Sequence, residues 1–267
     1  MSVDVVIEGV GVWSPELPGF AAARPLLRGD AAPAATPAAK PAPSLLAANE
    51  RRRAPDSVLL AFEVAQQACA MAQREPAALP AVFACAWGDL AISDYLCATL
   101  ARAPQDLSPT KFHNSVHNAP AGYWAIATGC MANTSAVSAA EATFAAGLLE
   151  AALLAQSEST PVVYAAYDIP ATGPLASVVA TRTLFGIGLV LAPRRERAGA
   201  ALRLALRGGT APRLAPEPAL LQSLHEHNPA ACGLPLLVAL ACGAPRMLAL
   251  PAGPQSVLDL EIGTWQN

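Results

Sequence analysis

The sequence contains few charged residues and no basic stripe. Asp, Glu, Lys and Arg make up 14% of the 267 residues, and the net charge is −3. Soluble domains usually contain about a quarter of such residues, and nucleic-acid binding usually needs a strongly positive surface, which argues against that class of function. Two explanations of the low charge stay open. Another subunit covers part of the surface, or the composition reflects a GC-rich genome.

The sequence also lacks long apolar runs and paired cysteines. No run approaches the roughly 20 residues that a bilayer-spanning helix needs. The residues after Met1 show no basic stretch followed by an apolar one, so no secretory signal is predicted. None of the six cysteines forms a CxxC pair, which argues against a disulfide framework. We therefore expect a cytoplasmic protein whose cysteines are reduced, buried and packed as small hydrophobic residues.

Proline is concentrated near the N-terminus. Residues 21–48 are rich in alanine and proline, which predicts an extended surface loop, because proline prevents a helix and disfavours a central strand. The one local basic cluster follows, at Arg51, Arg52 and Arg53. It is interpreted either as a solvated turn before a helix or as a docking point for an acidic partner.

The remaining sequence alternates between strand-like and helix-like stretches. Apolar or β-branched runs predict strands at residues 3–12, 81–87, 133–140, 161–166, 184–191 and 201–207. Apolar residues at spacings of three and four predict helices near residues 56–72, 92–100 and 141–156. This alternation favours a layered α/β fold. Residues 234–241 fit a buried helix or a buried strand, and periodicity alone does not decide between them.

Four stretches resemble, in the right order, the N-terminal half of β-ketoacyl synthases. They are residues 5–15, which match the opening G-x-G-x-x-S-P; residues 108–122, which precede the nucleophile; residues 134–143, the nucleophile elbow; and residues 185–191, the closing strand. The resemblance implies a thiolase-like α/β fold with a mixed central sheet and a truncated C-terminal half. It divides the chain into a half-domain at residues 1–192 and a short extension at residues 193–267 that packs on it.

The chemistry of this family needs a cysteine thiolate at the strand-to-helix elbow. The helix N-terminus there lowers the thiol pKa and donates N–H groups to the developing oxyanion. The resemblance places Glu141 at that position, flanked by Ala140 and Ala142, and both histidine motifs of the family are absent. We expect no catalytic residue in this chain. Glu141 either stabilises its own helix electrostatically or acts as a general base that decarboxylates a malonyl group.

The segment before the elbow is the expected interface. In the family it packs across the dimer axis and reaches the neighbour's acyl tunnel. The residues assigned to partner or tunnel contact are Phe112, His113, His117, Asn118, Tyr123, Trp124 and Glu141. Simple core packing is the alternative for Tyr123 and Trp124. A zinc pair at His113 and His117 lacks a third ligand, so backbone-bonded core or interface histidines are favoured.

The resemblance implies a non-catalytic, chain-length-factor type subunit, similar to short ketosynthase-like proteins of aryl-polyene and xanthomonadin pigment clusters. Its expected partner is an active full-length ketosynthase in a heterodimer, with an acyl carrier protein contacted indirectly. No metal, organic cofactor, nucleic acid or membrane insertion is expected. Two alternatives stay open: a small malonyl-thioester decarboxylase or acyl-thioester hydrolase that uses Glu141, and a homodimeric scaffold.

Overall fold

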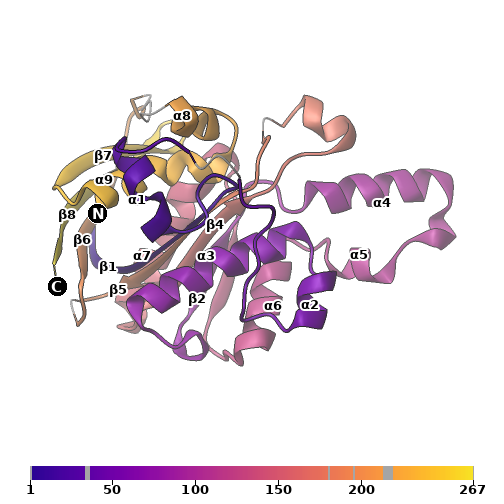
Figure 1. The fold of residues 1–267 in the computed structure, drawn as a ribbon, viewed down its shortest axis with the longest axis horizontal. Coiled ribbons are helices and arrows are strands. Elements are labelled where there is room, and N and C mark those ends of the chain that lie inside the picture. Colours follow the sequence, from indigo (N-terminus) through magenta and orange to yellow (C-terminus); the bar gives the residue numbers. More distant parts are fainter. Residues whose placement is uncertain (1, 34–36, 180, 195, 213–218, 267) are drawn as a thin grey trace.

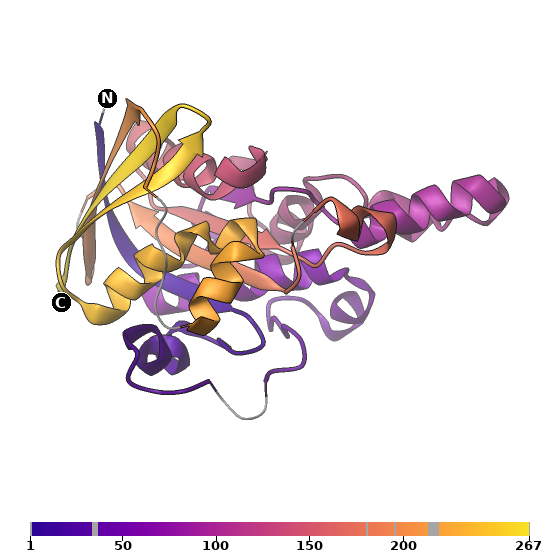
Figure 2. The same cartoon turned by 90° about the horizontal axis from the view of Figure 1, so that it is seen from above.

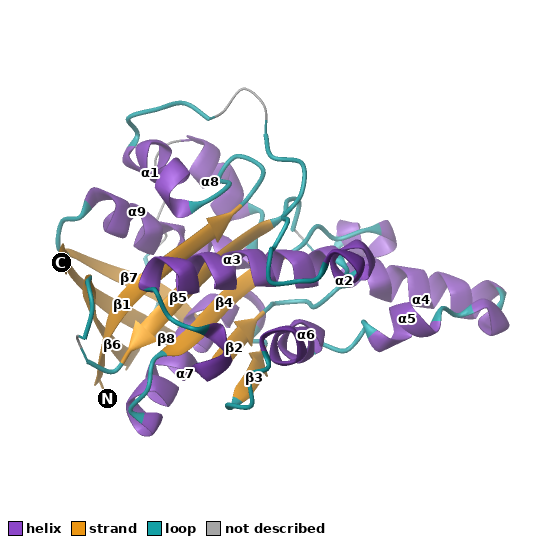
Figure 3. Cartoon of the chain, turned by 60° about the horizontal axis from the view of Figure 1, so that its bottom comes forward, coloured by secondary structure: helices purple, strands orange, loops and turns teal. Residues whose placement is uncertain are grey.

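The fold is built around one eight-stranded mixed sheet (Figures 1 and 3). The computed structural model describes residues 2–33, 37–179, 181–194, 196–212 and 219–266. Within these residues the strands are β1 (Ser2–Trp13), β2 (Ala81–Ala84), β3 (Thr134–Val137), β4 (Val162–Asp168), β5 (Phe185–Ala192), β6 (Gly199–Gly208), β7 (Arg246–Gly253) and β8 (Ser256–Gln266). Their order across the sheet is β3-β2-β4-β5-β1-β6-β8-β7. Strand β2 runs parallel to β3 and β4, and all other pairs are antiparallel.

Helices cover the sheet in layers. The α-helices are α1 (Phe20–Arg28), α2 (Ala48–Arg53), α3 (Asp56–Ala72), α4 (Leu90–Arg102), α5 (Pro109–His113), α6 (Ala119–Thr128), α7 (Thr143–Glu158), α8 (Ala219–Glu226) and α9 (Leu234–Cys242). Helix α3 packs on β1, β4 and β5, and α6 packs beside it on β2 and β3. Helix α7 packs on the opposite face of these strands. The predicted layered α/β architecture is confirmed.

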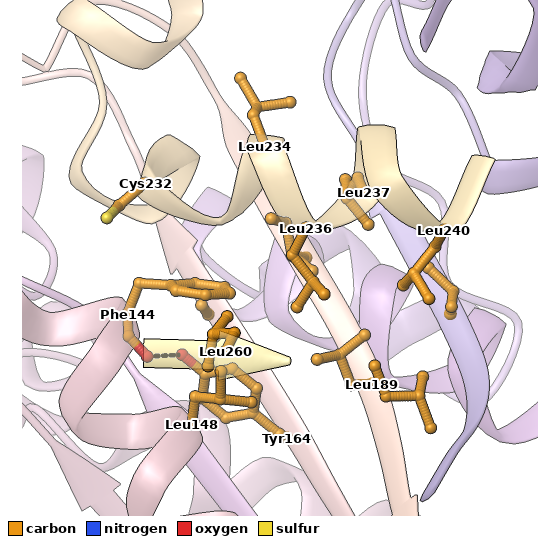
Figure 4. Close-up of a cluster of buried hydrophobic side chains, with 14 of the residues drawn as sticks. Phe144, Leu148, Tyr164, Leu189, Cys232, Leu234, Leu236, Leu237, Leu240 and Leu260 are labelled. Atoms are coloured by element: carbon orange, nitrogen blue, oxygen red, sulfur yellow. Dashed lines mark hydrogen bonds between the residues drawn. The ribbon is translucent and has the colours of Figure 1, made fainter. Parts of the chain in front are cut away.

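The part of the chain after residue 192 joins the same hydrophobic core. Strand β7 packs against α7, and α9 packs against β7 and β8. Figure 2 shows the C-terminal strands (yellow) on the same side of the molecule as the N-terminal strand (indigo). Figure 4 shows Phe144 and Leu148 of α7 beside Leu236 of α9 and Leu260 of β8. The hydroxyl of Tyr164 donates to the carbonyl oxygen of Phe144 at 2.7 Å, which satisfies the one polar group of that ring.

Glycines let α3 lie directly on the strands. A Cβ atom at Gly9 or Gly11 of β1, or at Gly188 of β5, would overlap a carbonyl oxygen of α3. The overlapping atoms belong to Ala68 and Val64, and backbone atoms of a packed helix cannot move aside. This close approach explains the glycines at residues 9 and 11 of the opening motif.

A buried ion pair fills an irregularity of β1 just before these glycines. The register of β1 against β5 shifts between Ile7 and Gly9, and the Glu8 side chain between them is buried. Arg74 beyond α3 donates to both carboxylate oxygens, at 2.8 and 2.9 Å. Removing one partner of such a pair leaves an uncompensated charge, so each of the two residues depends on the other.

The outer face of β6, β8 and β7 is open to solvent. Side chains along β6 alternate between buried and exposed, and β6 lies between β1 and β8. The exposed face carries ion pairs of Arg203 with Asp4 and Glu261, and of Arg207 with Asp259. An antiparallel sheet tolerates one solvated face when polar side chains line it.

The structure differs from the sequence-based expectation in three places. Residues 20–28 form α1 despite Pro25, because Phe20, Ala23, Leu26 and Leu27 are buried on one side of the helix, which packs on α9. Tertiary packing here outweighs the hydrogen bond that proline removes. Residues 34–36 of the expected loop lie outside the described residues.

The other two differences concern a basic cluster and the cysteines. Arg51–Arg53 end the helix α2 instead of forming a turn. All six cysteines are free, as expected, but Cys97 and Cys242 are exposed. They occupy the outer side of α4 and the C-terminus of α9, where the small apolar side chain has no covering element.

Candidate functional site

An apolar groove of about 810 Å³ lies between α2, α5 and α6. Its lining residues come from the end of the expected loop and from the segment before the elbow: Leu45, Leu46, Ala47, Glu50, Phe112, His113, Val116, Asn118, Ala119, Gly122, Tyr123, Ile126 and Ala127. Phe112 is 62% exposed and Ile126 is 86% exposed. Side chains this apolar and this exposed on one surface mark a site that another molecule covers.

The structure brings four of the seven predicted contact residues into this groove and leaves three, His117, Trp124 and Glu141, outside it. Phe112, His113, Asn118 and Tyr123 line the groove. His117 lies in the turn after α5, where its Nε2 is 2.8 Å from the carbonyl oxygen of Cys85. Because α5 ends at His113, the two histidines do not share a helix face. No group of three potential metal ligands exists among the described residues.

Trp124 belongs to the core on the inner side of α6. It is fully buried, and its ring packs edge-on against Phe62 of α3 at 5.1 Å and Phe83 of β2 at 5.9 Å. Sequence reasoning missed Val116 and Ile126 as groove residues. Ile126 lies on the solvent side of α6, two positions beyond Trp124. Because most residues of α6 are apolar, the sequence pattern does not show which of them face outward.

The end strand of the sheet lies next to the groove. Strand β3 pairs with β2 on one side only, and all four of its residues are partly exposed. Helix α6 packs on β3, which joins the groove to this open edge. An edge strand presents unpaired N–H and C=O groups and can add a strand from another chain. Groove and edge together form one surface suited to a protein partner.

The elbow between β3 and α7 carries no cysteine. The single helical turn Ala140–Ala142 precedes α7, and Ala140 has a left-handed backbone with φ of 48°. Thr143 fixes this turn, since its Oγ1 accepts from the N–H of Ala139 at 2.8 Å and donates to the carbonyl of Ala140 at 2.6 Å. Glu141 is exposed and lies in the first turn, where a carboxylate is favoured by the helix dipole.

A small pocket of about 130 Å³ faces the elbow from the C-terminal part of the chain. Glu141, Thr181, His225, Asn228 and Cys232 are among its lining residues. Burial, with a further contribution from the carboxylate of Glu141, raises the pKa of the Cys232 thiol to about 12. Cys232 therefore stays protonated near neutral pH and is a poor nucleophile.

His225 does not supply this pocket with a free imidazole for catalysis. Its Nδ1 is 3.0 Å from the carbonyl oxygen of Ala231, which fixes the ring. The ring is half-buried, close to the single helical turn Pro229–Gly233. His227 is held by the carbonyl oxygen of Ser223 at 2.9 Å.

A buried carboxyl group beneath this site escaped sequence reasoning. Asp168 ends β4 and accepts from the N–H of Ala86 at 2.9 Å, the thiol of Cys85 at 3.2 Å and the N–H of Ala230 at 3.1 Å. Burial raises the pKa of Asp168 to about 7, and these hydrogen bonds only partly oppose it. Asp168 thus ties the end of β2 to the C-terminal part of the chain. The only sequence signal was an acid at the end of an apolar strand.

The thiols provide a direct test of these environments. We expect two of the six cysteines, Cys97 and Cys242, to react rapidly with a disulfide reagent in the native protein. Cys69, Cys85, Cys130 and Cys232 are buried and should react only after denaturation. The double variant Cys97→Ser, Cys242→Ser should show no fast phase. A fast thiol remaining in that variant would contradict the burial of the other four cysteines.

Comparison with known proteins agrees with the layered sheet. The sequence profile of the family described as "Beta-ketoacyl synthase, N-terminal domain" matches residues 28–239. The chain belongs to this family. No curated protein matches the sequence. None of the helices in the described part of the chain has the length and apolar character of a bilayer-spanning segment.

Several solved ketosynthase structures share the fold. One is described as the ketosynthase (ApeO) in complex with its chain length factor (ApeC) from Xenorhabdus doucetiae, with 19% identity, a TM-score of 0.73, and coverage of 97% of this chain and 99% of that one. The ishigamide ketosynthase/chain length factor is 15% identical, with a TM-score of 0.74 and coverage of 98% of this chain and 99% of that one. A type II polyketide synthase acyl carrier protein in complex with its ketosynthase (AntDE:AntF) is 12% identical, with a TM-score of 0.70 and coverage of 99% of this chain and 100% of that one. The expected thiolase-like α/β fold is confirmed.

Proposed function

We propose that this β-ketoacyl synthase family member is a non-catalytic, chain-length-factor type subunit. It pairs with a catalytically active ketosynthase in fatty-acid or polyketide-type biosynthesis, completes the dimer interface and shapes the partner's acyl tunnel. Residues 1–192 serve as the ketosynthase-like half-domain and residues 193–267 as an extension that packs on it. The proposed partners are cytoplasmic enzymes and carrier proteins, so the same location is proposed for this chain.

The elbow carries this proposal. Carbon–carbon bond formation on a carrier protein needs a nucleophile that accepts the acyl chain. Residues 138–142 offer Ser138, three alanines and Glu141 there. Ser138 donates its hydroxyl proton to the carbonyl oxygen of Ala86 at 2.9 Å. The nearest thiol across the elbow pocket, Cys232, is protonated. A chain that keeps the fold without the nucleophile supports a partner's chemistry instead.

The surface supports pairing with a protein of the same fold. The groove and the β3 edge form one continuous apolar and strand-pairing surface, which suits the corresponding edge of a related subunit. Helix α4 projects from the body (Figure 2), with Leu90 and Ile92 as its buried residues. Leu100 near the end of α4 is exposed. A projecting helix with so little burial gains stability when a partner packs on it.

A charge placed in the groove tests the pairing. Ile126→Glu puts a carboxylate where the partner would bury an isoleucine, and a charge desolvated without a partner costs several kcal/mol. Copurification with the active ketosynthase of the same organism should yield a one-to-one complex with the wild type. The variant should weaken this complex at least tenfold, as measured by light scattering and titration.

Met247→Glu is the matched control. Met247 is exposed on β7, on the far side from the groove, so this variant should pair like the wild type. A homodimer that persists in the presence of the ketosynthase would contradict the proposal. So would condensation of malonyl and acyl groups by this chain alone.

A further inference from the structure

The elbow pocket carries negative charge without a paired cation. Two carboxylates line it, those of Glu141 and Glu226, and no lysine or arginine is among its described lining residues. Neither carboxylate forms an ion pair within the part of the chain that the structure describes. Arg182, next to Thr181 in the chain, is exposed and does not line the pocket. The charges of the lining therefore favour a cation over an anion.

Thr181 contributes a buried hydroxyl group to this lining. The residue is only 2% exposed, and its Oγ1 has no hydrogen-bond partner among the described residues. Its backbone is fixed, because its carbonyl oxygen accepts from the N–H of Ala171 at 3.1 Å. A buried polar atom without a protein partner calls for a ligand or an ordered water. A hydroxyl oxygen accepts hydrogen bonds, so it suits a ligand that donates them.

His225 adds a second acceptor. Its Nδ1 lies 3.0 Å from the carbonyl oxygen of Ala231, and a carbonyl oxygen only accepts. Nδ1 therefore carries the hydrogen, and Nε2 of the neutral ring is an acceptor. No described residue forms a hydrogen bond with this Nε2. The ring thus enters the pocket lining with one acceptor atom still available.

The carboxylate of Glu141 is the third acceptor. Besides burial, this carboxylate raises the pKa of the Cys232 thiol, so its charge acts on the inner wall of the pocket. No group of three potential metal ligands exists among the described residues, so the acceptors are not placed for direct coordination of a metal ion. An ammonium group needs only hydrogen-bond acceptors around it, and it donates three hydrogen bonds.

We propose that the elbow pocket binds a small primary ammonium ion. Its three N–H groups donate to the carboxylate of Glu141, the hydroxyl oxygen of Thr181 and Nε2 of His225. The volume of about 130 Å³ is several times the roughly 10–15 Å³ that one water needs, which leaves room for a short alkyl chain. Pro229 and Pro251 supply apolar walls for that chain. The site goes beyond the proposed pairing and does not depend on it.

Three probes separate the charge from the hydrogen-bond donors. Propylammonium carries both, propanol lacks the charge, and tetramethylammonium has the charge but no N–H group. Calorimetric titration of the isolated protein at constant ionic strength should show binding of propylammonium, weaker binding of tetramethylammonium and none of propanol. Glu141→Gln and Thr181→Val should each weaken binding of propylammonium about fivefold, the size expected for the loss of one hydrogen bond.

Glu150→Gln is the matched control, because Glu150 is an exposed carboxylate of α7 that does not line the pocket. It removes the same charge as Glu141→Gln and should bind propylammonium within twofold of the wild type. Circular dichroism checks that each variant is folded. Affinity that is unchanged in Thr181→Val, or tetramethylammonium binding as tightly as propylammonium, overturns the proposal. Pairing with a ketosynthase plays no part in this measurement, so the two proposals can fail separately.

Discussion

Gly11→Val is expected to abolish stable folding. A Cβ atom at Gly11 would overlap the carbonyl oxygen of Val64 in α3 and press on Cβ of Gln67. The helix would have to lift from the sheet, and α3 is the most extensively buried helix on that face. We expect a loss of at least about 3 kcal/mol in the free energy of unfolding, the upper range for overpacking. Urea denaturation followed by circular dichroism measures it.

Gly122→Ala is the control for glycine replacement as such. Gly122 lies inside α6, and an added Cβ meets no atom within 4 Å. Alanine in a helix interior is favoured over glycine by about 0.5–1 kcal/mol, so this variant should be slightly more stable than the wild type. A Gly11→Val protein within about 1 kcal/mol of the wild type would show that α3 does not contact β1 so closely.

The stability of the protein should fall as the pH rises from 4 to 7, with Asp168 as a principal cause. Below pH 3.8, the ordinary pKa, its carboxyl is protonated in both the folded and the unfolded chain. Between 3.8 and about 7 the unfolded chain loses the proton and the folded chain keeps it. Unfolding then releases a proton, so the free energy of unfolding decreases by about 1.4 kcal/mol per pH unit from this group, or about 4 kcal/mol in all.

Asp168→Asn isolates this contribution. The amide cannot titrate, so the variant should lack the decrease of about 4 kcal/mol between pH 4 and pH 8. At low pH it should be about 1–3 kcal/mol less stable, because its NH₂ group meets an N–H donor such as that of Ala230. Asp56→Asn, at an exposed carboxylate, should keep the wild-type profile. Identical profiles for the wild type and Asp168→Asn would refute the assignment.

The elbow shows how far sequence reasoning reaches. The motif around residues 134–143 predicted a strand, a tight turn and a helix, and the structure contains them in that order. It also predicted a carboxylate where the family has a thiol. The left-handed residue of the turn, Ala140, precedes Glu141 by one position, a detail that depends on how Thr143 closes the turn. Side-chain hydrogen bonds of that kind leave no periodic signal.

The helix α1 shows where sequence reasoning failed. Residues 21–48, which include Pro25, were predicted to form a loop, because proline removes one hydrogen bond from a helix. The burial of Phe20 and Leu27 against α9, more than 200 residues away in the chain, reverses that preference. Propensity is a weak signal when a distant element supplies the packing.

The alternation of strands and helices, the glycines of the opening motif and the absence of a cysteine at the elbow can all be read from the sequence. Each of these is a local property, because periodicity and residue type are read along one element. Which surfaces remain open and which groups are buried depends on how distant segments pack. The apolar groove and the surroundings of Asp168 each combine segments far apart in the chain, and the pKa of an acid follows from the burial that those segments create.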